Sequence, residues 1–195
     1  MIDVELAGTV KEAISGSQEA WNLLVERFSG LVWSIARSQL LDISDASDVS
    51  QTVWLRLAEH IGVLREPEHV DAWLAVTARH EAQRVQKRRQ FQVPVSYERL
   101  LRLPEANPRH PEAEVIAAEE SETLWRAFAL LGEACRTLLR MLITDPPPSY
   151  AVVSETLGLP IGSIGPTRSR CLNHLREQFE TDAVQTRQTG QYTAR

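Results

Sequence analysis

Residues 149–176 decide the fold, and they read SYAVVSETLGLPIGSIGPTRSRCLNHLR. Ser149 is a typical helix N-cap, and Gly158 suits the left-handed residue of a tight turn between two helices. Ser163 is expected to cap the second helix. The buried stripe of that helix is predicted to contain Ile164, Cys171, Leu172, Leu175 and Phe179. This pattern is typical of a helix-turn-helix, although a two-helix corner in any helical protein has similar spacing.

The opposite face of the second helix is polar. The residues on this face are Pro166, Thr167, Arg170, Asn173 and His174. The candidate DNA-binding residues of the helix are Ser163, Pro166, Thr167, Arg168, Arg170 and His174, of which Arg168 lies beside the buried stripe. A recognition helix enters the major groove with its N-terminal residues foremost, and the first of these side chains lie at that end. Pro166 is expected in the first turn, where the backbone amides have no intrahelical partner to lose.

The first half of the chain has the apolar periodicity of α-helices. Helices are predicted near residues 4–14, 17–41 and 42–60, and from about residue 69 into the basic segment that follows. The apolar stripe of the second of these helices contains Trp21, Leu24, Val25, Phe28, Leu31, Val32, Ile35 and Ala36. No alternating strand pattern occurs in this half, so we expect an all-helical bundle.

Four prolines interrupt the chain after this bundle, at positions 94, 104, 108 and 111. Residues 104–122 also carry six Glu against a single Arg, which is typical of an acidic, semi-extended tether. The predicted fold class is therefore all-α, with two small helical domains joined by a flexible linker. The expected boundaries are 1–90 for the first domain, 91–120 for the linker, 121–180 for the second domain and 181–195 for a disordered tail.

The formal net charge is −5 at pH 7, but the charge is unevenly distributed. Residues 79–102 carry seven basic side chains against two acidic ones, and residues 163–178 carry three Arg against one Glu. The rest of the chain has a net charge of −12. An acidic body repels phosphate at long range, while two basic patches attract it locally. We therefore expect the chain to bind free DNA weakly and to need a partner before it engages DNA.

Other site types are not predicted. No apolar run reaches the roughly 18 residues of a membrane helix, and the N-terminus lacks the layout of a signal peptide, so we expect a cytoplasmic protein without membrane insertion. Cys135 and Cys171 lie alone in helical patterns and are expected to be unpaired and buried. The five His are scattered and hydrolase motifs are absent, so no catalytic residue, metal site or cofactor is predicted.

Residues 149–176 resemble region four of the extracytoplasmic-function (ECF) sigma factors of the sigma-70 family. Residues 48–57, DVSQTVWLRL, are similar to the polymerase-binding helix of region two, and residues 72–81, AWLAVTARHE, are similar to its promoter-melting helix. The resemblance covers about residues 3–90 and 121–179, in family order and spacing. The chain departs from the family pattern at Ser50, Thr52, Gly165, Pro166 and Arg168, so no base preference is carried over.

The resemblance implies a sigma factor that directs core RNA polymerase to promoters and assists DNA melting. The helix of Asp48, Gln51 and Leu55 is then expected to dock on the clamp helices of the largest polymerase subunit. The residues expected on the minus-ten side are Trp73, Thr77, His80, Arg84, Lys87, Arg88 and Arg89, the last three as phosphate contacts. A Trp on an apolar helix stripe is more often a core residue, so both roles stay open for Trp73.

On the minus-thirty-five side, Thr167, Arg170 and His174 are expected to read bases, while Arg168 is placed to contact phosphate. The further partners that the resemblance implies are the flap region of the polymerase, promoter DNA and an anti-sigma factor. The acidic linker is similar to the family connector that threads toward the RNA exit path. The alternative is a stand-alone helix-turn-helix regulator, which would need a dimer to span two half-sites.

Overall fold

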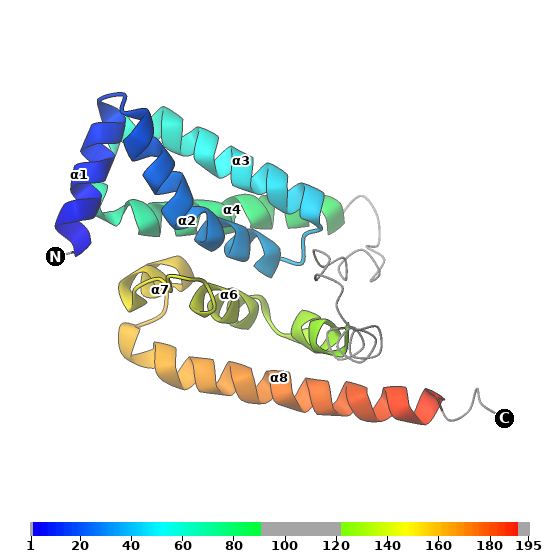
Figure 1. The fold of residues 1–195 in the computed structure, drawn as a ribbon. Helices are drawn as coiled ribbons and strands as arrows, with labels where there is room; N and C mark the ends of the chain where they lie inside the picture. Colours follow the sequence, from blue (N-terminus) through cyan, green and yellow to red (C-terminus); the bar gives the residue numbers. More distant parts are fainter. Residues whose placement is uncertain (1, 91–121, 191–195) are drawn as a thin grey trace, which may run out of the picture.

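The computed structural model describes residues 2–90 and 122–190, and every regular element in these two ranges is a helix (Figure 1). The first range contains α1 (Ile2–Ile14), α2 (Gln18–Ser38), α3 (Ile43–His60), the short 3₁₀ helices η1 (Ile61–Val63) and η2 (Pro67–His69), and α4 (Val70–Gln90). The second contains a helix over residues 122–130, then α6 (Glu133–Leu142), α7 (Tyr150–Leu157) and α8 (Ile161–Gly190). The predicted all-α fold is confirmed. The predicted linker lies outside the described residues.

Side-chain hydrogen bonds fix where three helices begin. Ser17, Asp42 and Ser149 each accept a hydrogen bond from the backbone N–H three residues later, at 3.2, 2.9 and 3.3 Å respectively. These caps satisfy amides that the first turn of a helix leaves unpaired. At the end of α7, Gly158 has φ 66° and ψ 31°, the left-handed conformation predicted for it.

The helices α1–α4 form one bundle with an apolar core. α4 contributes Leu74 and a run of small residues, Ala75, Ala78 and Ala82, which are all completely buried. Small side chains allow α4 to pack closely against α2 and α3. The buried apolar residues of α2 and α3 are Ala20, Leu24, Phe28, Leu31, Val32, Ile35, Ala36, Ala46, Val49, Val53 and Leu57.

The second helix set packs directly on the first. α6 packs against α2 and α7 packs against α4, while α8 lies on the far side of α6 and α7 (Figure 1). Nothing in the sequence predicted this contact, because the residues that form its hydrogen bonds lie 50 to 106 positions apart. In this structure the two helix sets are therefore in direct contact.

The start of α8 differs from its prediction. The helix begins at Ile161, two residues before the expected cap, and the hydroxyl of Ser163 donates to the carbonyl oxygen of Pro160 at 2.7 Å. Ser163 is therefore inside the first turn and does not cap the helix. Pro166 consequently lies in the helix interior, where a proline removes one backbone hydrogen bond, rather than in a first turn that has none to lose.

The end of α8 also corrects a prediction. Residues 181–190 were expected in a disordered tail, but they continue α8 as far as Gly190. Near this point Arg126 Nε lies 3.1 Å from Asp182 Oδ2, an ion pair that ties α8 to the helix over residues 122–130. The polar composition of this segment favoured disorder, whereas the structure shows a continuous helix. Residues 191–195 lie outside the described part of the chain.

Cys135 of α6 and Cys171 of α8 form a disulfide, with their Cα atoms 5.4 Å apart. The expectation of two unpaired cysteines is wrong. Helical periodicity correctly placed Cys171 on the buried stripe, but it cannot tell which side chain of another helix faces that position. The two residues are 36 positions apart in the sequence, and only the packing of α6 on α8 brings them together.

We expect reduction of this disulfide to lower the stability of the second helix set by about 3 kcal/mol, because the link closes a long loop in the unfolded chain. Urea unfolding followed by circular dichroism, with and without reductant, measures this change. Replacing both cysteines with serine provides the control, since this variant should not respond to reductant. Equal unfolding midpoints for the wild type under both conditions would contradict the prediction.

Among the described residues, no helix is long and apolar enough to cross a lipid bilayer. In the same part of the chain, no three His, Cys, Asp or Glu side chains are grouped in a way that could hold a metal ion.

Candidate nucleic-acid interface

α4 has three faces that follow from a helical repeat of about 100° per residue. Leu74, Ala78 and Ala82 face the core. Arg79 and Gln83 form a second face, which meets α6 and α7. The third face contains the residues predicted on the minus-ten side, Trp73, Thr77, His80 and Arg84, which follow one another at helical spacing. These four residues therefore lie on one side of α4.

The members of this stripe differ in exposure. His80 and Arg84 are exposed, whereas Thr77 and Trp73 are half-buried. Trp73 packs against the apolar core of the bundle, so the core interpretation holds for part of its ring. The residue as a whole remains partly exposed.

Arg84 is held by a carboxylate that the sequence prediction did not single out. Glu81 Oε1 accepts a hydrogen bond from Arg84 Nη1 at 3.1 Å, and Arg56 Nη2 of α3 lies 3.1 Å from the same oxygen. The side chain of Glu81 is only 9% exposed. This buried acid therefore ties α3 to α4 and restrains Arg84 at the edge of the stripe.

Three basic side chains lie at the C-terminal end of α4, and two of them are exposed while the third is ion-paired. Lys87 and Arg88 are exposed. Arg89 Nη2 instead donates to Asp42 Oδ2 at 2.8 Å, and Arg89 also pairs with Asp45 at the start of α3. Burial lowers the pKa of Arg89, but the hydrogen bonds and charges of Asp42 and Asp45 outweigh this effect and raise the pKa above its ordinary value.

The position of Arg89 differs from those of Lys87 and Arg88, which were predicted with it as phosphate contacts. Counted at about 100° per residue, Lys87 and Arg88 fall within about 60° of the third face of α4, whereas Arg89 falls on the core side. The sequence shows three consecutive basic residues and does not reveal this difference. Arg89 anchors α4 to the N-terminus of α3.

The predicted polymerase-docking stripe lies on the outer face of α3. Asp48 and Gln51 are exposed, and the side of the helix that contacts the core is formed by Val49 and Val53. Leu55 is 61% exposed, which is unusual for a leucine in a helix that packs against two others. All three residues are thus exposed at the surface of α3.

The polar face of α8 also lies at the surface. Pro166, Arg168, Arg170 and His174 are exposed, and Ser163 and Thr167 are half-buried. Arg170 Nη2 donates to Thr167 Oγ1 at 3.0 Å. These two side chains therefore form a preassembled polar pair near the start of the helix.

The buried side of α8 is narrower than predicted. Ile164 and Cys171 are buried and Leu175 packs against the core. Leu172 was expected in the same stripe but is 40% exposed. It lies about 80° around the helix from Ile164, which is consistent with its greater exposure.

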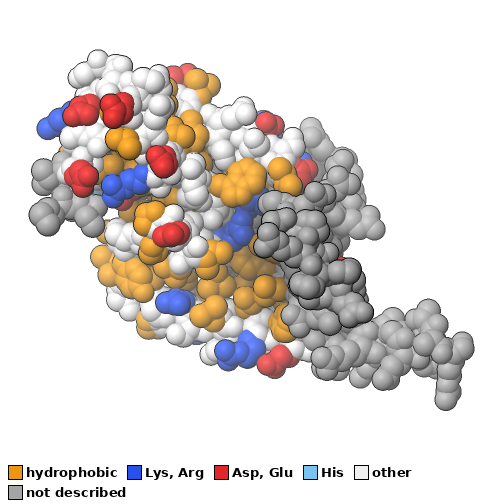
Figure 2. Space-filling view, viewed as in Figure 1, with side chains coloured by type: hydrophobic (Ala, Val, Ile, Leu, Met, Phe, Trp, Pro, Cys, Tyr) orange, Lys and Arg blue, Asp and Glu red, His pale blue; other side chains and the backbone are white. Residues whose placement is uncertain are grey.

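Charge is mixed on the face shown in Figure 2, where acidic and basic side chains are scattered over the first helix set and no patch of one sign dominates. This agrees with the net negative charge of the chain. Nucleic acid would be held by local groups of residues, such as those of α4 and α8, rather than by a broad basic surface.

Arg79, Glu133 and Arg136 were missed as functional candidates. Arg79 was counted in a basic patch, yet it bonds Glu133 from 54 positions away. No local pattern marks such a pair, because both residues look like ordinary polar positions on their own helices.

Comparisons with known proteins show a family match for part of the chain and a similar fold for most of it. Residues 24–92 match the family model described as Sigma-70 region 2. No curated protein matches the sequence significantly. A solved structure, "Structure of CnrH in complex with the cytosolic domain of CnrY", is similar with a TM-score of 0.63 at 18% sequence identity, covering 91% of this chain and 98% of that chain.

Residues 24–92 include α3, α4 and most of α2, so the match covers the greater part of the first helix set. The second helix set lies outside this match, and the likeness to the CnrH structure extends over both sets as a likeness of fold.

Proposed function

We propose that this chain directs core RNA polymerase to specific promoters, reading a minus-ten element with α4 and a minus-thirty-five element with α8. The observation that carries the proposal is the arrangement of region 2. One outer face, on α3, has the exposed docking stripe, and a different face, on α4, has the exposed polar and basic residues. A sigma factor needs these two faces at once, because it must hold polymerase and DNA together.

Promoter melting would occur at the third face of α4. The half-buried ring of Trp73 and the exposed side chains of His80 and Arg84 could hold unpaired bases and their phosphates. The segment from Gly62 to Glu68, which contains the 74%-exposed Val63, lies beside the start of this helix and would complete the binding surface. Strand opening would then be driven by binding, since stacking on aromatic rings stabilises extruded bases.

The proposed partners are core polymerase, through its largest-subunit clamp helices and its flap region, promoter DNA and an anti-sigma factor. The similar structure supports the last of these in a limited way, because its title describes CnrH in complex with the cytosolic domain of CnrY. The linker proposed to approach the RNA exit path lies outside the described residues.

The docking stripe can be tested directly. Replacing Asp48 and Gln51 with alanine should weaken binding to core polymerase about tenfold, because each residue contributes a polar contact at the interface. Folding should change by no more than about 0.5 kcal/mol, since both side chains are exposed. Fluorescence anisotropy with labelled chain measures the affinity, and thermal unfolding measures the stability.

The matched control replaces Asn22 and Glu26 of α2 with alanine, which removes an exposed amide and an exposed carboxylate from another helix. Its affinity for core polymerase should equal that of the wild type. If the Asp48 and Gln51 variant unfolds, or if both variants bind equally well, the assignment of α3 as the docking helix fails.

A further inference from the structure

The N-terminal part of α8 contains a proline at a position where helices rarely tolerate one. Pro166 lies inside the helix, which begins at Ile161. It therefore cannot donate the backbone hydrogen bond that the carbonyl oxygen of Gly162 would otherwise accept. Residues that break a local rule of folding in this way are expected at functional positions. The unfavourable placement of Pro166 thus indicates a role beyond helix stability.

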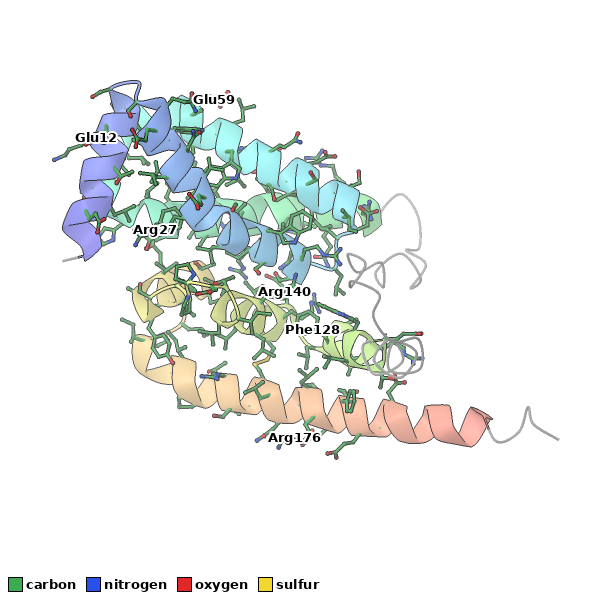
Figure 3. The ribbon with its side chains drawn as sticks, viewed as in Figure 1. Glu12, Arg27, Glu59, Phe128, Arg140 and Arg176 are labelled. Carbon is green, nitrogen blue, oxygen red and sulfur yellow. A yellow bond between two sulfur atoms is a disulfide. The ribbon has the colours of Figure 1, made fainter. Side chains whose placement is uncertain are left out.

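Pro166 lies on the side of α8 that faces away from the rest of the protein. At about 100° per residue, it is about 140° to 180° around the helix from Ile164, Cys171 and Leu175, which pack inward. The residue is exposed, and Figure 3 shows Arg176, farther along α8, also pointing away from the other helices. A recognition helix presents this outer side to the base edges of the major groove.

The helix surface around Pro166 is open. A Cβ atom placed on Gly162 or Gly165 would meet nothing within 4 Å beyond the adjoining helix backbone. Gly162 lies one turn before Pro166 on the same side of α8. No side chain of that turn therefore stands between the proline ring and a surface that approaches the start of the helix.

The hydroxyl groups at this end of α8 already have partners. Ser163 Oγ donates to the carbonyl oxygen of Pro160 at 2.7 Å, and Thr167 Oγ1 accepts a hydrogen bond from Arg170 Nη2 at 3.0 Å. Residues 161–167, IGSIGPT, contain no charged side chain. The outer side of this end of the helix is therefore apolar at the proline ring.

We propose that the ring of Pro166 contacts the C5 methyl group of a thymine in the minus-thirty-five element. The contact rests on the proposed function, in which α8 reads this element. The thymine methyl is the apolar group that base pairs present in the major groove, so it matches an exposed apolar ring. Arg170 lies within about 40° of Pro166 and about 6 Å farther along the helix axis. Since base pairs are about 3.4 Å apart, the thymine should lie one or two base pairs from the position that Arg170 reads.

The test removes only this methyl group from the DNA. Holoenzyme first selects preferred sequences from a promoter library randomised through the minus-thirty-five element, and each selected thymine is then replaced by deoxyuridine. At one position, deoxyuridine should weaken holoenzyme binding about fourfold, the factor that corresponds to burial of one methyl-sized group. With Pro166→Ser, thymine and deoxyuridine at that position should bind equally, and the selected sequences should lose the thymine preference.

The Pro166→Ser variant should fold at least as well as the wild type, because serine restores a backbone amide that can donate to Gly162. Thermal unfolding measures this. The matched control is Ile161→Ser, which removes another apolar side chain, 54% exposed, from the start of α8. Ile161 lies about 140° around the helix from Pro166, so this variant should keep the fourfold dependence on the methyl group.

Two results would overturn the thymine contact. One is a selected element in which deoxyuridine binds as well as thymine at every position, and the other is a methyl dependence that persists unchanged in Pro166→Ser. In both cases, base preferences within the element would still support the proposed function. Holoenzyme without any base preference in this element would refute both the reading by α8 and the contact of Pro166.

Discussion

Holoenzyme that carries Lys87→Ala and Arg88→Ala should bind promoters about 30-fold more weakly at physiological salt, by about the same factor for every sequence. Both side chains are exposed at the end of α4 and lie near the stripe proposed to face DNA. Each lost phosphate contact should also reduce the slope of log affinity against log salt by about 0.9, so the double variant should lose about 1.8. Filter binding or anisotropy across a salt series measures both effects.

Arg89→Ala is the internal control for this prediction. Arg89 pairs with Asp42 and Asp45 instead of facing solvent, so its loss should destabilise the packing of α4 on α3 by about 1 kcal/mol and leave the salt slope unchanged. A slope that falls equally in both variants would mean that Arg89 also reaches phosphate. An unchanged slope in the Lys87 and Arg88 variant would mean that these residues form only a solvated helix end.

Arg170→Ala should relax base preference at one or two positions of the minus-thirty-five element. The side chain is exposed on the outer face of α8 and is already oriented by its hydrogen bond to Thr167. An arginine that makes two hydrogen bonds to a guanine edge discriminates by about 1–3 kcal/mol against the wrong base. Transcription by the variant holoenzyme from a promoter library randomised through that element measures the change.

Arg176→Ala supplies the comparison, because Arg176 is exposed farther along α8 and points away from the rest of the molecule (Figure 3). It should leave the preferences intact. If Arg170→Ala lowers transcription from all promoter sequences alike, Arg170 is a phosphate contact. Thr167 would then be the candidate for base recognition.

The local features of this fold could be predicted from the sequence because each depends on neighbouring residues. The caps at Ser17, Asp42 and Ser149 and the left-handed Gly158 all follow from residue type and position within a helix. The exposed stripe of α3 follows equally from helical spacing. Helix boundaries were less accurate, because Ser163 is an acceptable cap by type but lies one turn too late.

The features that the sequence did not reveal all depend on contacts between distant residues. The disulfide of Cys135 with Cys171, the ion pair of Arg79 with Glu133 and the pairing of Arg89 with Asp42 join positions 36 to 54 apart. Each of these residues has an ordinary explanation within its own helix. Only the packing of the helices identifies the partner, and in the case of Arg89 it also changes the expected role.

Run-off transcription tests most directly the proposal that this chain is a promoter-specificity subunit of RNA polymerase. Core polymerase should start at particular sites on a genomic template library only when the chain is added, and the Asp48→Ala, Gln51→Ala variant should reduce this activity about tenfold. The chain alone should bind the same DNA weakly, as its net charge of −5 implies. Tight, sequence-specific binding by the chain without polymerase, together with no defined start sites in its presence, would contradict the account and favour a stand-alone regulator.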